Sequence, residues 1–319
     1  MKNEKNKVRP AVEKMSDEKL SKKLGRLQAA ESLGISFGVI CLVIGTITAF
    51  TIHNRTVFTV LFFVGVAAII FLGLCCQKKK KALINQQLGD FFNEELQKAF
   101  GDEPSNPQFP IDRGYLEKSE LIIPDWEECT VSNFREGVHN GTKFSAANVQ
   151  LRHSVEEKSG PNNDNWMTRS VTVFEGVVIR CGDVANSVFD IVINDTMREK
   201  KSDKDISEPA VFLERFTAKT ADGRDAAALI RPEIREMFRE LEKISLGRVC
   251  GFAVRGGELS LALGTKYIFA NIPNSLDARD IDGMRKWYKA SLEGMGKLLD
   301  IIKNNLAPDN TKVGSNTTE

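Results

Sequence analysis

Two apolar runs decide the fold of this chain: LGISFGVICLVIGTITAFTI, from Leu33 to Ile52, and VFTVLFFVGVAAIIFLGLCC, from Val57 to Cys76. Each has twenty residues and no formal charge. A helix rises 1.5 Å per residue, so twenty residues cover about 30 Å, which is the thickness of the hydrocarbon core of a bilayer. The runs therefore predict two transmembrane helices. The alternative, a buried helix of a soluble domain, rarely extends so far without a charge.

The flanks of the two runs predict the topology. Only His53, Asn54, Arg55 and Thr56 separate the runs, so the helices must form an antiparallel hairpin. Residues 1–32 carry nine Lys or Arg against five acids, and four lysines follow the second run. Because basic flanks are retained in the cytoplasm, we expect a two-pass protein of the plasma (inner) membrane with both termini cytoplasmic. A cleaved signal peptide would have a shorter apolar core, and no second span would follow it so closely.

Small residues mark one face of the first run. A helix beginning at Ser16 should continue unbroken into the bilayer, and Gly34 and Gly38 form a G-x-x-x-G pair that Gly45 extends by one heptad. Such residues let two helices approach closely. We expect the contact within the hairpin, because the short loop enforces proximity. Contact between copies in a homo-oligomer is the alternative.

A basic collar follows the second run, made of Lys78, Lys79, Lys80 and Lys81. It is interpreted as facing the lipid bilayer, where anionic headgroups of the inner leaflet attract such clusters. The alternative is that these lysines fix the topology and do nothing more.

The remainder of the chain is acidic. The whole sequence of 319 residues has 44 basic and 43 acidic side chains, and once residues 1–32, Arg55 and the collar are set aside, residues 82–319 carry a net charge of −8. Binding to nucleic acid needs clustered Lys and Arg, so we expect no nucleic-acid partner.

The six cysteines suggest a reducing compartment. They form no C-x-x-C pair and have no zinc-like spacing to the three histidines, so we expect no metal and no cofactor. The neighbours Cys75 and Cys76 are read as apolar residues at a helix end, with palmitoylation as the alternative.

The sequence divides into a basic helix (1–32), the hairpin (33–76), an amphipathic juxtamembrane helix (77–101), a proline-rich linker (102–110), a soluble α+β domain (111–307) and a polar tail (308–319). The apolar row of the juxtamembrane helix, from Ile84 to Phe100, is expected to lie either on the membrane surface or on the soluble domain.

Turn signals and periodicity predict a mostly antiparallel sheet in the soluble domain. Asn140-Gly141 and Gly256-Gly257 should each join two strands of a hairpin. The segments 168–182 and 187–195 should form another strand pair, and 211–225 should be a further strand closed by Asp222-Gly223. A possible third strand follows the second hairpin near residues 265–270.

Two helices are predicted in the same domain. One begins with Pro232 and has apolar residues at Ile234, Met237, Phe238 and Leu241. A long C-terminal helix begins near Ser275, Asp277 and Asp280 and ends by Pro308. Its heptad row of Ile281, Tyr288, Met295 and Ile302 should pack on the chain's own sheet, and a dimerisation seam is the alternative.

Catalytic motifs are missing from the sequence. There is no G-x-S-x-G, no H-E-x-x-H and no phosphate-binding loop. His139 and His153 are conceivable bases or metal ligands, but partly exposed strand histidines are the simpler interpretation. The oxygen-rich loop Asn162, Asn163, Asp164, Asn165 is interpreted as solvated rather than as a cation site.

Four segments, in this order after the two apolar runs, carry a resemblance to a known family: FREGVHNGTKFSAANVQL, FEGVVIRCGD, FLERFTAKTADGRDAAALIRPEIREMFREL and GRVCGFAVRGGELSLAL. Over roughly residues 30–305 the chain resembles the uncharacterised bacterial two-span membrane family catalogued as domain of unknown function 3137. The matching positions are Gly137 or Gly141, Phe144, Phe174, Gly176, Glu214, Phe216, Ala227, Ile230 and Pro232. The resemblance implies an inner-membrane protein with a cytoplasmic α+β domain, and it implies no reaction.

The expected fold class is therefore α+β, with an N-terminal transmembrane helical hairpin, a mostly antiparallel-sheet cytoplasmic domain and a long C-terminal helix. The expected function is a membrane-anchored, non-enzymatic module for interaction or sensing, with another membrane or cytoplasmic protein as its partner. The alternative is a membrane-tethered enzyme with an unrecognised site on the sheet that uses His139 or His153.

Overall fold

The structure is a computed structural model, and it describes residues 14–51, 55–102, 104, 107–122, 126–158, 166–182, 190–196, 206–220, 223, 225, 230–265, 269–273 and 276–306. Several features predicted from the sequence lie outside these residues: the basic segment 1–13, His53 and Asn54 of the outer loop, the oxygen-rich loop 162–165, Asp222, Ala227, most of the third strand after Thr265, Ser275, Pro308 and the tail 308–319.

The chain forms two compact units. The helical unit comprises residues 1–94 and 273–287, and the sheet unit comprises residues 95–272 and 288–319. The segment 273–287 thus belongs with the N-terminal helices although nearly two hundred residues separate them in the sequence.

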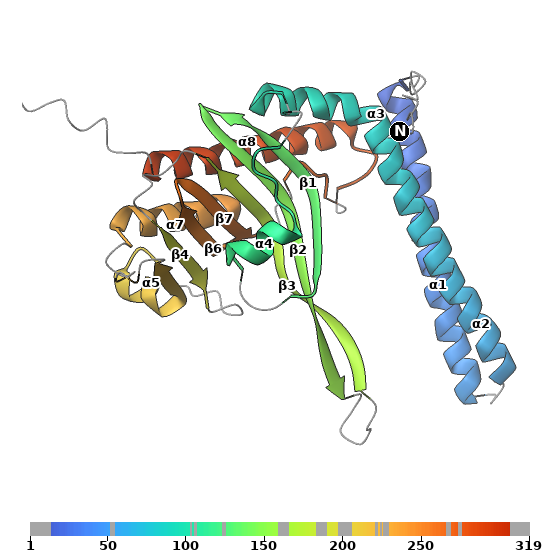
Figure 1. Cartoon of the computed structure of the whole chain (residues 1–319). Helices are drawn as coiled ribbons and strands as arrows, with labels where there is room; N and C mark the ends of the chain where they lie inside the picture. The colour runs from blue at the N-terminus through green and yellow to red at the C-terminus, as the bar shows by residue number, and fades with distance from the viewer. Residues whose placement is uncertain are drawn as a thin grey trace, which may run out of the picture. The chain divides into compact units, whose positions relative to one another are not determined.

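The helical unit contains the two apolar runs, each inside a longer helix (Figure 1). Helix α1 covers Asp17–Thr51, and its first turn includes a hydrogen bond from the Leu20 N–H to the Ser16 carbonyl, 3.0 Å long. Helix α2 covers Arg55–Ala68, a π-helix η1 covers Ile69–Leu74, and α3 covers Cys75–Phe100. The expectation that the first helix continues unbroken is confirmed. The helix expected at 77–101 is not a separate element, because it continues the second apolar run.

Helix α3 ends where the sequence predicts a stop. Gly101 adopts φ +77°, and its N–H donates to the carbonyl of Gln97. Glycine reaches this left-handed conformation without the penalty that a Cβ would impose, and it commonly ends helices for that reason.

The sheet unit is built on seven antiparallel strands in the order β1-β2-β3-β7-β6-β4-β5. Their bounds are Glu128–His139, Thr142–Lys158, Trp166–Cys181, Ile191–Asp195, Phe216–Thr220, Arg248–Arg255 and Glu258–Gly264 for β1 to β7. The predicted α+β class is confirmed. Both glycine hairpins are also confirmed: Asn140 and Gly141 have φ of +48° and +82°, and Gly256 and Gly257 have +57° and +84°.

Two strand predictions are wrong. Strands β3 and β4 do not pair with each other, because β7 and β6 lie between them in the sheet. Residues 211–215 are not strand either: helix α5 covers Pro209–Arg215, and only Phe216–Thr220 is extended. The reason is local, since Pro209 takes a first-turn position of the helix and the buried Phe212 and Arg215 are three residues apart, on one helical face.

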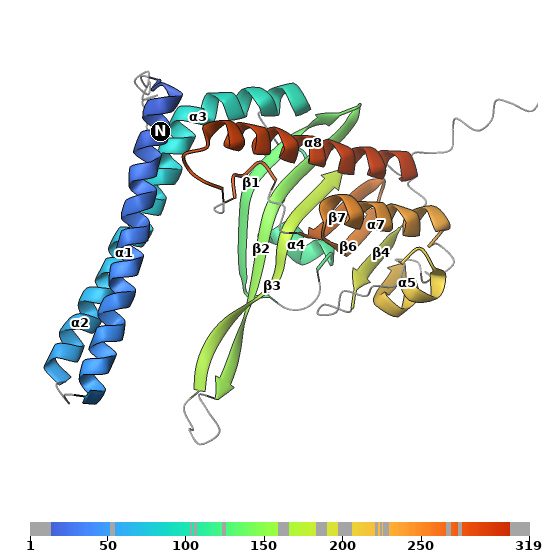
Figure 2. The same cartoon turned by 180° about the vertical axis from the view of Figure 1, so that it is seen from behind.

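Helices cover both faces of the sheet (Figures 1 and 2). On one face α4, Arg113–Ser119, packs over an apolar cluster that includes Ile111, Leu116, Val149 and Ala262. On the other face lie α7, Pro232–Ser245, and α8, Ile281–Leu306. The predicted apolar face of α7 is confirmed, because its four predicted residues are fully buried.

The side chains of the heptad row of α8 are buried within the chain. Tyr288 and Met295 are 3% exposed and Ile302 is fully buried. A helix whose seam is already covered by its own chain has no apolar row to offer a second copy. The expectation of packing within the chain is therefore confirmed, and the dimerisation seam is not found.

Candidate functional site

The predicted glycines lie where the two apolar helices meet. A methyl group added at Gly38 would lie 2.7 Å from the Gly65 carbonyl oxygen and would collide with Ile69, and one added at Gly34 would collide with Leu72. At Gly45 the closest atom would be Leu61 Cβ, at 3.3 Å. All three glycines are buried, so the structure assigns this face to contact within the hairpin.

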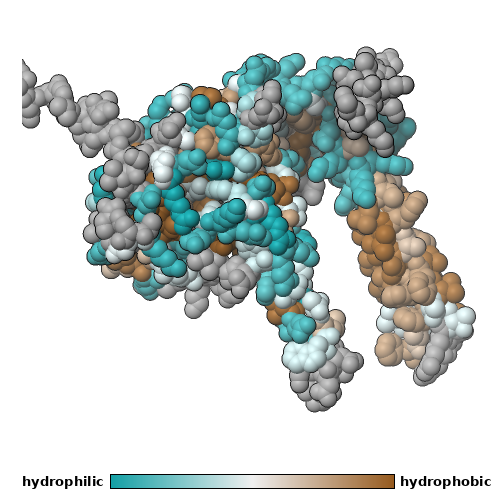
Figure 3. Space-filling view, viewed as in Figure 1, coloured by the Kyte–Doolittle hydropathy of each residue, from teal (hydrophilic) through white to brown (hydrophobic). Residues whose placement is uncertain are grey.

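The remaining surface of these helices is apolar and exposed. Leu33, Phe50 and Phe71 are 70%, 78% and 70% exposed, and Figure 3 shows the apolar surface concentrated on this part of the helical unit. The hydroxyl groups of Thr46, Thr48 and Thr51 donate to carbonyls four residues earlier at 2.7–2.8 Å. Such internal bonds satisfy hydroxyl groups where water is absent, as in a bilayer.

The four lysines of the collar differ in their surroundings. Lys78, Lys79 and Lys81 are exposed, whereas the Lys80 side chain is only 19% exposed and lies 3.1 Å from Glu31 of α1. The Gln77 amide also donates to Glu31, at 2.7 Å. Burial raises the pKa of Glu31, but these two hydrogen bonds outweigh it and the pKa is lowered overall. Glu31 thus joins α1 to α3 as a carboxylate.

The two histidines proposed as alternative catalytic groups are far apart. His139 Nε2 lies 3.0 Å from Asp300 Oδ1, at the end of the β1–β2 hairpin. His153 lies eleven positions beyond the hairpin partner Thr142 along β2, which is roughly 35 Å at the rise of an extended strand. His153 Nδ1 is 3.9 Å from Glu127. The structure therefore does not bring them into one site.

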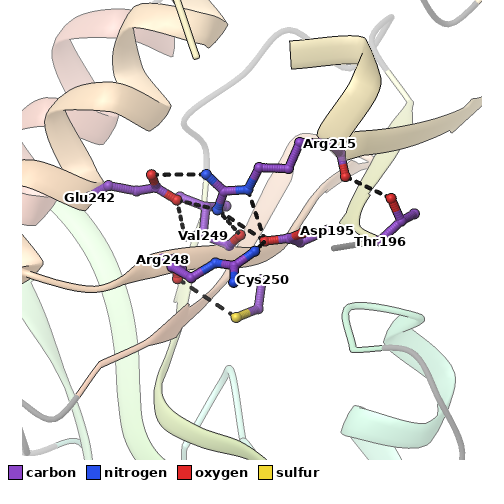
Figure 4. A network of polar contacts seen from close by, with 7 residues as sticks. All are labelled: Asp195, Thr196, Arg215, Glu242, Arg248, Val249 and Cys250. Carbon is purple, nitrogen blue, oxygen red and sulfur yellow. Dashed lines mark hydrogen bonds and ion pairs between the residues drawn. The ribbon is translucent and has the colours of Figure 1, made fainter. Parts of the chain in front are cut away.

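A buried ionic network joins four charged side chains of the sheet unit, Asp195, Arg215, Glu242 and Arg248 (Figure 4). Arg215 is the centre: its Nε donates to Asp195 Oδ2 at 3.0 Å, and its terminal nitrogens donate to both carboxylate oxygens of Glu242. Arg248 donates to the same Asp195 oxygen at 2.7 Å. The side chains of Arg215 and Asp195 are 6% and 4% exposed.

Local structure positions each member of this network. Asp195 ends β4, Arg215 ends α5, and Glu242 lies in the last turns of α7, where it also accepts from the Val249 N–H at 2.8 Å. Desolvation lowers the pKa of Arg215, but its hydrogen bonds and charge interactions with Glu242 and Asp195 outweigh this effect and raise the pKa. The two cations and the two anions thereby compensate one another, because a buried charge without a partner of opposite sign would be costly.

A cavity of about 190 Å³ opens beside the network. Its lining combines Asp195, Arg248 and Cys250 with Glu175 and apolar residues of β3 and its neighbours. Burial raises the pKa of the Cys250 thiol, and its Sγ lies 3.7 Å from the Arg248 carbonyl oxygen. A thiol that stays protonated is a poor nucleophile, so this cavity offers hydrogen bonding rather than covalent chemistry.

A second cavity, of about 400 Å³, lies between α4 and the β6–β7 hairpin. Its polar lining includes Lys118, Arg255, Asp112 and Glu258, and Tyr115 donates its hydroxyl proton toward Ser260 on its wall. Burial raises the pKa of Tyr115. Among the described residues, no three His, Cys, Asp or Glu side chains gather as the ligands of a metal would.

The long β2–β3 hairpin extends beyond the sheet as a two-stranded ribbon (Figures 1 and 2). Pairing with β1 stops at Arg152, and pairing with β7 stops at Gly176, while β2 and β3 stay paired out to Lys158 and Trp166. We call residues 153–158 and 166–172 the ribbon. Trp166 and Met167 are each 61% exposed. No other described strand pairs with the outer edges of the ribbon.

Sequence reasoning missed the network and the ribbon for different reasons. Asp195, Arg215, Glu242 and Arg248 are scattered over 54 positions and fit no motif. The ribbon carried a signal that was available: the alternating segments on either side of 159–165 are longer than a strand of ordinary length.

Comparisons with known proteins gave no counterpart: no protein-family model, no curated protein and no solved structure matches this chain.

Proposed function

We propose that this chain is a membrane-anchored, non-enzymatic module for interaction or sensing. Helices α1 and α2–η1 cross the inner membrane of a bacterium as a hairpin, both termini lie in the cytoplasm, and the sheet unit binds a partner protein. The resemblance to the two-span family belongs to the same proposal, since that family implies the same anchor and the same soluble domain.

One observation carries the anchoring: two helices are long and apolar enough to span a membrane, and most of their apolar side chains are exposed. A soluble protein rarely exposes an apolar surface of this extent. Anchoring predicts that the full chain stays in the membrane pellet after extraction with alkaline carbonate. Recovery of the chain in the supernatant would contradict it.

The ribbon supports partner binding. It presents a large aromatic residue, Trp166, and a flexible apolar one, Met167, on opposite faces of two strands whose outer edges pair with no other described strand. Aromatic residues and methionine are enriched in protein interfaces, and an edge strand of a sheet can accept a further strand from a partner. The ribbon is thus the surface of the sheet unit that we assign to the partner.

Site-specific photocrosslinking in living cells tests this assignment. A photoreactive amino acid at Met167 of the full chain should give a discrete crosslinked species containing a second protein. The matched control is Leu213 of α5, which is also apolar and is 50% exposed. A crosslink at neither position, or equally at both, would overturn the ribbon as the binding surface.

A further inference from the structure

The basic collar contains two kinds of lysine. Successive residues of a helix are 100° apart, so four consecutive lysines point in four directions around α3. Only Lys80 points toward α1, where it meets Glu31, whose side chain is 13% exposed. Lys78, Lys79 and Lys81 are exposed, and their ammonium groups have no protein partner among the described residues.

These three lysines follow directly after the second apolar run. Lys78 is two residues beyond Cys76 and Lys81 is five beyond it, so helical rise places them roughly 3 to 8 Å past the end of the run. In a membrane-spanning hairpin, that depth corresponds to the phosphate groups of the lipid headgroups, which lie just outside the hydrocarbon core. Among the described residues, the carboxylate of Glu31 faces this part of α3, and it already accepts hydrogen bonds from Lys80 and Gln77.

We infer that Lys78, Lys79 and Lys81 form a binding surface for anionic phospholipid headgroups, while Lys80 clips α3 to α1 and takes no part in lipid binding. This inference rests on the proposed anchoring. Charge complementarity carries the choice of ligand: three exposed ammonium groups lie around one turn of α3, and the described carboxylate nearest to them, Glu31, is compensated by Lys80 and Gln77. The headgroup phosphates of an anionic lipid match both the charge and the depth.

Spin-labelled lipids test the inference on the full chain in phosphatidylcholine vesicles. Electron spin resonance separates lipid at the protein boundary from bulk lipid, so it gives the preference for labelled phosphatidylglycerol over labelled phosphatidylcholine. A basic residue near an anionic membrane contributes about fivefold in binding, so the wild type should prefer phosphatidylglycerol severalfold at low salt. High salt should reduce this preference, because it screens exposed charges.

Two variants separate the two kinds of lysine. The triple variant Lys78→Gln, Lys79→Gln, Lys81→Gln should lower the preference for phosphatidylglycerol to near one. The double variant Glu31→Gln, Lys80→Gln, which removes the clip without changing net charge, should keep the wild-type preference. A triple variant that keeps the preference, or a double variant that loses it, would overturn the inference.

The same spectra distinguish failure of this inference from failure of the anchor. If the wild type shows no boundary-lipid signal at all, the hairpin does not insert and the proposed anchoring fails. If it shows a boundary signal without preference for the anionic lipid, the anchoring stands and the lipid-binding surface is refuted.

Discussion

Single glycines set the distance between α1 and the second apolar helix. At Gly38 the facing groups are the Ile69 side chain and the backbone oxygen of Gly65, and the backbone oxygen cannot move aside as a flexible side chain can. Gly89 of α3 is a useful contrast in the same unit, because a methyl group added there would meet nothing within 4 Å.

Replacing Gly38 by Ala should therefore destabilise the hairpin by about 1 to 3 kcal/mol, which is the usual cost of overpacking. The thermal melting of the full chain in detergent measures it. Gly89→Ala should leave the melting temperature unchanged or raise it, because alanine favours helix over glycine. Equal melting temperatures for the two variants would show that the glycine face does not pack within the hairpin.

Cys181 gives the sheet unit a dependence on alkaline pH. Burial raises the pKa of its thiol from 9 to about 12, so the folded chain keeps the proton that the unfolded chain loses. The contribution of this residue to stability is complete below pH 9 and is lost as the pH rises from 9 toward 12.

Between pH 8 and pH 10.5 the wild type should lose about 2 kcal/mol more stability than Cys181→Ala, at 1.36 kcal/mol per pH unit above 9. Denaturant unfolding at the two pH values measures the difference. Cys129→Ala removes a less buried thiol and should retain most of the wild-type loss. If the Cys181→Ala chain lost as much stability at alkaline pH as the wild type, the Cys181 thiol would not be the source of the pH dependence.

The ionic network joins four elements of the sheet unit: β4, α5, α7 and β6. Its members come from separate parts of the chain, so it can form only after those elements have assembled. Removing one partner leaves the opposite charges buried without compensation, which is the costly case for a buried ion pair.

Arg215→Ala should therefore lower the stability of the sheet unit by about 3 to 5 kcal/mol. Arg255→Ala breaks an exposed pair with Glu120, in which the side chains are 47% and 62% exposed, and should cost less than about 1 kcal/mol. Urea unfolding followed by tryptophan fluorescence compares them. Similar losses of stability for both variants would mean that the buried network does not stabilise the sheet unit more than an exposed ion pair does.

The ribbon is expected to contribute to binding and little to stability. Replacing residues 155–169 by Asn-Gly would close the hairpin after the Ser154–Ser170 pair with a turn that suits two strands. The shortened chain should melt within a few degrees of the wild type. Photocrosslinking at Met167 of the full chain identifies the partner. That partner should be pulled down with the wild type from crosslinked membranes, and it should not be pulled down with the shortened chain. A large fall in melting temperature would instead make the ribbon a structural element.

The sequence predicted elements better than their arrangement. The apolar runs, the two glycine hairpins and the face of α7 follow from local rules of hydropathy, turn geometry and periodicity, and all were predicted correctly. The placement of β7 and β6 between β3 and β4 depends on contacts between residues about eighty positions apart for β3 and β7 and about sixty apart for β4 and β6, for which a single sequence gives no signal. The segment 211–215 failed because a short helix and a strand with buried aromatic residues look alike over five positions.

The candidate site follows the same division. The glycine face and the lysine collar are local patterns, and they could be named before the structure was known. The separation of Lys80 from its neighbours could not, since it depends on Glu31 lying beside it across the hairpin. The network around Arg215 likewise needs the folded sheet, because no pair among its charged side chains is local in the sequence except Glu242 and Arg248, which are six positions apart.

At the scale of the whole molecule, the proposed topology places every part of the chain outside the hairpin on one side of the membrane. A tag at either terminus of the full chain should be protected from protease in intact cells and cleaved after permeabilisation. A cysteine introduced at Thr56, beside the outer loop, should react with an impermeant thiol reagent in intact cells when the native cysteines are absent. A tag cleaved before permeabilisation would refute the common cytoplasmic location.

The π-helix at Ile69–Leu74 holds more residues per turn than an α-helix, and α1 has no such segment. A π-turn holds more residues than an α-turn, so deletion of one exposed residue such as Phe71 can be absorbed by rewinding the segment to ordinary α-helix. The same deletion in α1 would swing every later side chain by about 100° and carry the small residues away from their partners. The hairpin is thus asymmetric: one arm tolerates a change of register that the other cannot.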